Sequence, residues 1–165
     1  MPGGQERALR RRINSVQSTK QITRAMELIA ATRVVKAMTR ANAARPYSTK
    51  MTGVIEDLAA GGVGIDDPLL RSSETVSSIG FVVITSDRGL AGAYNSSVIR
   101  AAEKEIMAAQ TEGKEYKLVL VGKKAADYFR FRNYQIEASF SGMTDTPSYE
   151  DARDVATTVR DLFVS

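Results

Sequence analysis

The sequence contains no cysteine and no histidine. Without cysteine the chain can form neither a disulfide nor a thiolate metal site, which fits a reducing compartment. Without histidine it lacks the commonest general base and metal ligand. Any catalysis would therefore rest on carboxylates, lysines or hydroxyl groups. We expect no catalytic residue, no metal site and no cofactor.

Long apolar runs are also missing. No stretch of eighteen apolar residues is present, so we expect no transmembrane span. The arginines near the N-terminus are not followed by an apolar segment, so this end does not have the pattern of a secretory signal. With 43% hydrophobic and 25% charged residues, the composition is typical of a soluble globular protein. A length of 165 residues fits one or two domains.

Glycine is absent between Gly4 and Gly53, and the one interior proline of that stretch is Pro46. The segment is rich in Ala, Arg, Met, Leu and Gln, which lose little side-chain freedom in a helix. We predict one continuous helix over residues 1–60 that bends at Pro46. Because ordinary helices have three or four turns, so long a helix must lie against another element.

Small or apolar residues recur along this segment at alternating spacings of four and three. That spacing is typical of a coiled coil, in which the repeat averages 3.5 residues. No second helix of comparable length is predicted in the chain, so the partner of this seam is missing from it. The predicted seam consists of Ala30, Val34, Ala37, Ala41, Ala44, Met51 and Ile55.

Charge is distributed unevenly along the chain. Residues 1–50 carry eleven Lys and Arg against two acids, a balance of +9, whereas the remaining residues balance to −5. Few acids stand one helical turn from these cations, so the helix cannot neutralise itself. A basic helix of this kind binds nucleic acid, an anionic membrane or an acidic protein surface.

A second domain follows the helix. Three glycines within residues 61–64 end the helix, and we interpret residues 61–77 as a linker. Residues 78–165 then alternate strands and helices in the order β-α-β-α-β-α, which predicts an α/β, Rossmann-like fold with a parallel sheet. This sheet is small and the chain stops at a helix, so we expect the domain to be incomplete. The predicted strands cover residues 79–85, 116–121 and 133–140, and the predicted helices cover residues 93–110, 122–130 and 148–163.

The loop after the first strand contains Asp87, Arg88, Gly89 and Gly92. Its G-x-x-G spacing matches neither the dinucleotide fingerprint nor a P-loop. We interpret it as a tight structural turn that packs the next helix onto the sheet. The alternative is a small-molecule site built on Asp87 and Arg88 at the carboxyl end of the strand.

Several stretches together resemble the gamma subunit of F-type ATP synthases. They are residues 22–38 (ITRAMELIAATRVVKAM), 43–47 (AARPY), 85–98 (TSDRGLAGAYNSSV) and 121–129 (VGKKAADYF). They occur in the family's order and extend over nearly the whole chain. The family's C-terminal helix is absent here, which indicates a fragment of a longer protein. The family's loop often has a cysteine where this sequence has Ala91.

The resemblance implies the central rotor shaft of the synthase, without chemistry of its own. The first helix would pair with a C-terminal gamma helix inside the alpha–beta hexamer, and the α/β domain would lie near the epsilon subunit and the c-ring. The complex would sit on the cytoplasmic face of the cell membrane and couple proton-driven rotation to ATP synthesis. On this basis the residues that face the hexamer would be Met26, Arg33, Lys36 and Arg40.

Two other functions are compatible with parts of the sequence. The basic helix could belong to a nucleic-acid-binding module, although it has one aromatic residue, Tyr47, and no known DNA-binding motif. The second domain could be a small nucleotide-binding Rossmann-type protein, although it lacks the nucleotide fingerprint.

Overall fold

A computed structural model describes residues 2–61, 68–70 and 75–165. The chain divides into two compact units, Met1–Ile65 and Asp66–Ser165. Within the described residues, no helix combines the length and the apolar character needed to cross a bilayer.

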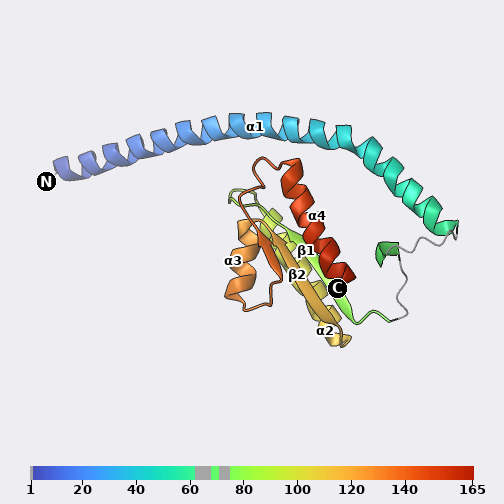
Figure 1. The fold of residues 1–165 in the computed structure, drawn as a ribbon. Helices are drawn as coiled ribbons and strands as arrows, with labels where there is room; N and C mark the ends of the chain where they lie inside the picture. Colours follow the sequence, from blue (N-terminus) through green and yellow to red (C-terminus); the bar gives the residue numbers. More distant parts are fainter. Residues whose placement is uncertain (1, 62–67, 71–74) are drawn as a thin grey trace. The chain divides into compact units, whose positions relative to one another are not determined.

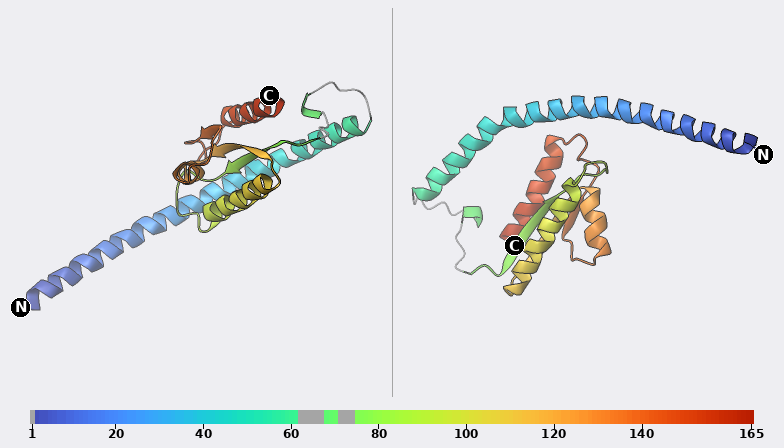
Figure 2. Two further views of the ribbon diagram at one scale, coloured as in Figure 1. Left: turned by 90° about the horizontal axis from the view of Figure 1, so that it is seen from below. Right: turned by 180° about the vertical axis from the view of Figure 1, so that it is seen from behind.

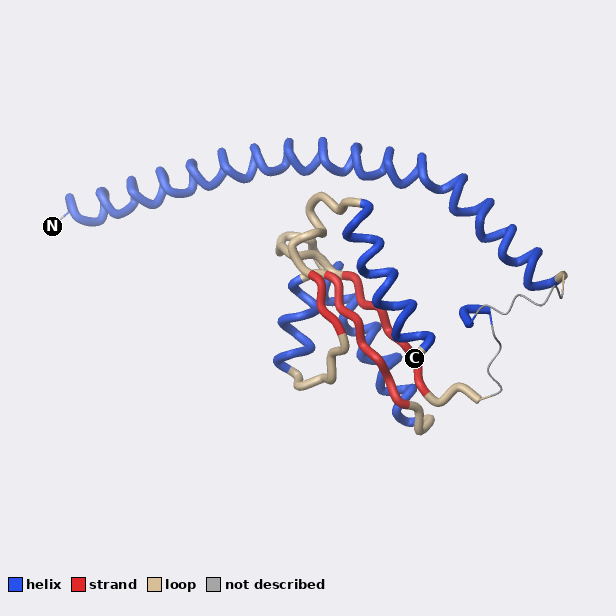
Figure 3. Tube along the Cα trace, viewed as in Figure 1, coloured by secondary structure: helices blue, strands red, loops and turns tan. Residues whose placement is uncertain are grey.

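In the first unit the structure describes one helix, α1 (Pro2–Ala60), of 59 residues. At 1.5 Å per residue its path is about 90 Å long. The helix continues through Pro46 and is bowed along its length (Figures 1 and 3), as the sequence predicts. Several threonine hydroxyls of α1 donate a hydrogen bond to the backbone carbonyl one turn back. Bonds of this kind are made by Thr19, Thr23, Thr32, Thr39 and Thr52.

The predicted linker, residues 61–77, lies largely outside the described residues. Its described part includes a short 3-10 helix, η1 (Pro68–Leu70).

The second unit is an α/β fold with three parallel strands in the order β1-β2-β3. Val119 in the central strand pairs with Val82 on one side and Ala138 on the other. This arrangement confirms the predicted fold class and the order of elements. The elements are β1 (Ser78–Ile84), α2 (Tyr94–Thr111), β2 (Glu115–Val121), α3 (Lys123–Phe131), β3 (Ala138–Phe140) and α4 (Tyr149–Val164).

The sheet lies between two layers of helices. Helices α2 and α3 cover one face and α4 lies against the other (Figure 2). The main core is on the first face, where Ile106, Leu118, Leu120 and Phe129 are fully buried. No residue of α4, which the structure describes throughout, is buried. The second face is therefore only thinly covered.

The third strand is shorter than the sequence predicts. It covers Ala138–Phe140 rather than residues 133–140. Asn133 takes a left-handed conformation (φ 57°) and ends α3, with its N–H donating to the carbonyl of Arg130. Tyr134 then turns inward and packs edge-on against Phe129, with the ring centres 5.0 Å apart. This segment therefore contributes to the core instead of extending β3.

Candidate functional site

The predicted seam lies on one unbroken helix, so its spacing of four and three keeps its members on one side of α1. Every seam residue is exposed. Its largest members, Val34, Met51 and Ile55, are 55%, 42% and 46% exposed. Between the larger residues stand alanines, which let a second helix approach closely but bury little area themselves. The arrangement suits a long helical partner.

The predicted basic residues form a row along one flank of this seam. Arg33, Lys36 and Arg40 each stand one position before a seam residue, and successive residues of a helix are about 100° apart. Met26 stands seven residues before Arg33 and so continues the same row. All four side chains are exposed.

The opposite flank carries a row of apolar residues that the sequence reasoning missed. Leu28, Val35 and Met38 are 73%, 64% and 59% exposed. Val35 and Met38 each stand one position after a seam residue, and Leu28 stands one heptad before Val35. Their signal was the same spacing shifted by one residue. The middle of α1 therefore presents two adjoining apolar rows. Together they are wider than the surface that a single partner helix would cover.

Positive charge on α1 is balanced only in part by the helix itself. Arg10 pairs with Glu6 at 2.8 Å and Arg24 with Glu27 at 2.9 Å. These two glutamates are the only acids among residues 1–50, which hold eleven cations. Exposed pairs of this kind contribute about 0–1 kcal/mol each. The helix thus keeps a strong positive field toward any acidic surface.

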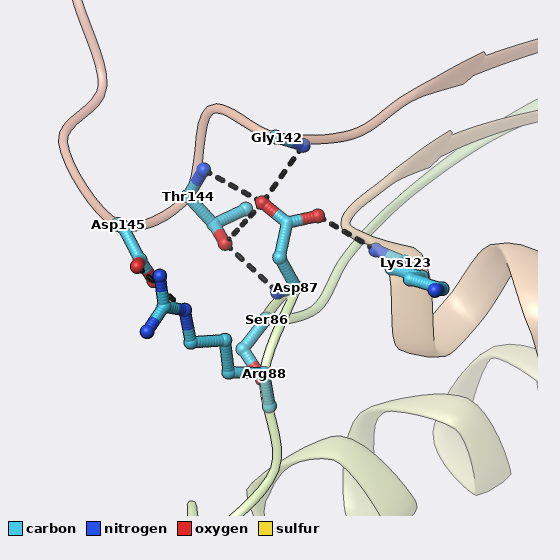
Figure 4. Close-up of polar contacts among 7 residues, drawn as sticks. All are labelled: Ser86, Asp87, Arg88, Lys123, Gly142, Thr144 and Asp145. Atoms are coloured by element: carbon cyan, nitrogen blue, oxygen red, sulfur yellow. Dashed lines mark hydrogen bonds and ion pairs between the residues drawn. The ribbon is translucent and has the colours of Figure 1, made fainter.

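The second predicted region, the loop of residues 85–92, centres on the carboxylate of Asp87. Its Oδ1 accepts a hydrogen bond from the backbone N–H of Lys123 at 2.9 Å. Its Oδ2 accepts three, from the N–H groups of Gly142 (2.9 Å) and Thr144 (3.0 Å) and from the Thr144 hydroxyl (2.7 Å). The Asp87 N–H in turn donates to Thr144 Oγ1 at 2.8 Å. Figure 4 shows how these donors converge.

These hydrogen bonds keep Asp87 ionised. Partial burial alone would raise its pKa, but the bonds from Gly142, Thr144 and Lys123 outweigh that effect and lower the pKa to about 2. Beside it, Arg88 Nε lies 2.8 Å from Asp145 Oδ2 (Figure 4). Four hydrogen bonds of Asp87 and one ion pair of Arg88 therefore join the loop after β1 to the loop after β3.

The same loop also ties β1 to the start of α2. The Ser86 N–H donates to Asn95 Oδ1 at 2.9 Å, and the Tyr94 hydroxyl donates to the Ile84 carbonyl at 2.9 Å. Gly92 has a positive φ of 55°, but at the first turn it is Leu90, not Gly89, that is left-handed (φ 62°). Leu90 projects from the loop and is 92% exposed. These contacts support the interpretation of a structural turn.

The sequence reasoning brought Asp87 and Arg88 to attention but missed their partners. Lys123, Gly142 and Thr144 lie 36 to 57 residues further along the chain. No local pattern marks them. Their proximity to Asp87 could have been inferred only from the strand topology, because the carboxyl ends of parallel strands meet at one edge of a sheet.

Comparison with known proteins gives a consistent result. The ATP synthase family model matches residues 5–165. The ATP synthase gamma chain of Frankia casuarinae is 48% identical over 98% of this chain and 54% of its own length. The ATP synthase gamma chain of Saccharopolyspora erythraea is 44% identical over 98% of this chain and 52% of its own. The chain thus spans about half the length of the curated relatives it matches.

A solved structure shares the fold. It is a cryo-EM structure of the central stalk and c-ring of the mitochondrial ATP synthase from Tetrahymena thermophila. The matched chain superposes with a TM-score of 0.65 at 23% identity, over 86% of this chain and 59% of that one.

Proposed function

This chain belongs to the ATP synthase gamma-chain family, and from that premise we propose that it forms part of the central rotor shaft of an F-type synthase. In this role it does no chemistry of its own. It transmits the proton-driven rotation of a membrane ring to catalytic subunits that make ATP.

The observation that carries the proposal is the surface of α1. A 59-residue helix with an exposed seam, a basic row and an apolar row is built to be enclosed by other chains. Helices gain most of their stability from packing, and α1 has nearly all of its side chains exposed. The nucleic-acid and nucleotide-binding alternatives have no observation in their favour.

We assign partners to α1 by face. The seam takes a C-terminal gamma helix, which the alanines allow to approach closely. Met26, Arg33, Lys36 and Arg40 face the alpha and beta subunits, whose acidic side chains balance the basic row. The α/β unit meets the epsilon subunit and the c-ring, and the complex lies on the cytoplasmic face of the cell membrane.

Rotation requires contacts that hold the shaft and still let it turn. Exposed ion pairs contribute about 0–1 kcal/mol each. The basic side chains can therefore break an ion pair with one acidic residue and form the next without a large free-energy barrier to rotation. Larger apolar contacts of fixed geometry would resist each step. A weakly held cationic surface is thus suited to a turning element.

The test is assembly with a purified bacterial alpha–beta hexamer. Reversing Arg33 and Lys36 to Glu replaces attraction by repulsion at two positions of the basic row. We expect binding to weaken by about tenfold or more at low ionic strength, the equivalent of about 1.4 kcal/mol. The loss should shrink as salt screens the charges.

A matched control reverses Lys104 and Lys124 to Glu, which makes the same change of charge on exposed residues of α2 and α3. This control should bind the hexamer like the wild type. Unchanged assembly of the Arg33/Lys36 variant at low ionic strength would contradict the proposal.

A further inference from the structure

The hydrogen bonds of the Asp87 carboxylate connect all three loops at the carboxyl edge of the sheet. Asp87 itself follows β1, Lys123 begins α3 directly after β2, and Gly142 and Thr144 follow β3. Four donors from two of these loops meet one side chain of the third (Figure 4). The carboxylate thus joins segments that the sequence separates by up to 57 residues.

This edge is the place where open parallel sheets bind ligands. It also holds the N-terminus of α3, where backbone N–H groups attract anions. In this chain the first N–H of α3, that of Lys123, points to Asp87 Oδ1, while the N–H groups of the last loop point to Oδ2. The donor set has the composition of an anion site, and the anion in it is the chain's own side chain.

We propose that Asp87 acts as an internal ligand, filling with its own carboxylate an anion cradle formed by the loops after β2 and β3. The occupied cradle fixes these loops to the β1 loop. It also holds in place the turn that presents the exposed Leu90. Without the side chain, the cradle is a binding site for a small external carboxylate.

The ionisation of Asp87 supports this assignment. Acceptance of four hydrogen bonds lowers the pKa of the carboxyl to about 2, so it is the anionic form that the cradle stabilises. The side chain is only half-buried, so an anion from solvent has access to the same place. The two loops donate to different oxygens of the carboxylate. A carboxylate places one acceptor atom before each loop, whereas a chloride ion has a single acceptor centre for both.

The test is chemical rescue of the full chain. Asp87→Gly removes the carboxylate and its Cβ, which leaves room for formate. Unfolding is followed by near-UV circular dichroism of the tyrosines, five of which lie in the α/β unit. We expect the variant to lose about 8 °C or more in Tm. About 0.2 M sodium formate should restore at least half of this loss, because it binds only the folded cradle. Sodium chloride of equal ionic strength should restore none.

Two further variants separate the cradle from general effects. Asp87→Asn keeps the shape of the side chain but turns an amide N–H₂ toward backbone donors, so this variant should be less stable than the wild type. Formate should not rescue it, because the asparagine side chain still fills the cradle. Asp151→Gly removes a carboxylate that, among the residues the structure describes, accepts hydrogen bonds only from Ser148. Formate should not rescue that variant either.

Each result decides for or against the internal ligand. An Asp87→Gly chain that is unfolded without formate and folds on its addition supports the proposal. Wild-type stability of Asp87→Gly or Asp87→Asn would overturn it. So would equal rescue by chloride, rescue of Asp151→Gly to the same extent, or an Asp87→Gly chain that stays unfolded in formate.

Discussion

Gly122 sits where the backbone of β1 meets the start of α3. Its φ of +96° is one that other residues rarely adopt, and a Cβ there would lie 2.1 Å from the carbonyl oxygen of Thr85. The buried Thr85 hydroxyl accepts a hydrogen bond from the N–H of Ala125 at 2.9 Å. The close approach of Gly122 lets this buried threonine cap α3.

Replacing Gly122 by Ala should therefore be severely destabilising. The new methyl group would have to displace backbone, not a flexible side chain, and would sit on a strained dihedral. We expect a loss of about 3 kcal/mol or more in the free energy of unfolding, measured by urea denaturation.

The control is Gly80→Ala in β1. A Cβ at this position meets nothing within 4 Å and the backbone needs no positive φ. Its effect should stay within about 0.5 kcal/mol. Equal losses for the two variants would show that the close contact at Gly122 is not what matters.

The sequence predicted the contacts and backbone conformations of single residues less well than the types of the helices and strands. The loop glycines were expected to make the turn, but Leu90 takes the left-handed conformation ahead of Gly92. The partners of Asp87 could not be read locally, because they lie in loops that only the folded sheet brings together. Contacts of this kind depend on tertiary structure and leave no pattern in neighbouring residues.

Among the elements, α4 is stabilised more by the hydrogen bonds that cap it than by burial of its side chains. None of its residues is buried. Its first turn is held by a capping box, in which the Ser148 hydroxyl accepts from the Asp151 N–H at 3.1 Å and the Asp151 carboxylate accepts from the Ser148 N–H at 2.8 Å. The two residues of this capping box stand three positions apart, so the cap is encoded in the local sequence.

Replacing Ser148 by Ala should lower the stability of the α/β unit by about 1 kcal/mol, since the N–H of Asp151 loses its partner. The measurement is the urea midpoint from near-UV circular dichroism. Thr157→Ala, at an exposed interior position of the same helix, should be neutral or stabilise by a few tenths of a kcal/mol. If both variants behave alike, the cap contributes nothing.

Element type followed from local periodicity, whereas element length did not always do so. The absence of glycine predicted α1, and short apolar runs predicted β1 and β2. Residues 133–137 also alternated weakly, but Asn133 ends α3 and Tyr134 joins the aromatic core. Core packing outweighed the strand pattern there, and it could not be foreseen without knowing which side chains surround Phe129.

For the whole molecule, the two units differ in how they are stabilised. The α/β unit has its own core around Phe129, Ile106 and Leu120. In α1 nearly all side chains are exposed, so its stability depends on binding. The uneven charge and the seam made this contrast predictable from the sequence. The apolar row of Leu28, Val35 and Met38 was not predicted, although it stands beside the seam with the same spacing shifted by one residue.

Hydrogen exchange of the chain, alone and with a purified alpha–beta hexamer, tests the central claim most directly. In the free chain, amides of α1 should exchange much faster than those of β2, because an exposed helix opens locally at little cost. Addition of the hexamer should slow exchange by about tenfold or more over residues 22–45 and leave α2 and β2 unchanged. Unaltered exchange in α1, or protection confined to the α/β unit, would contradict the assignment of α1 as the shaft.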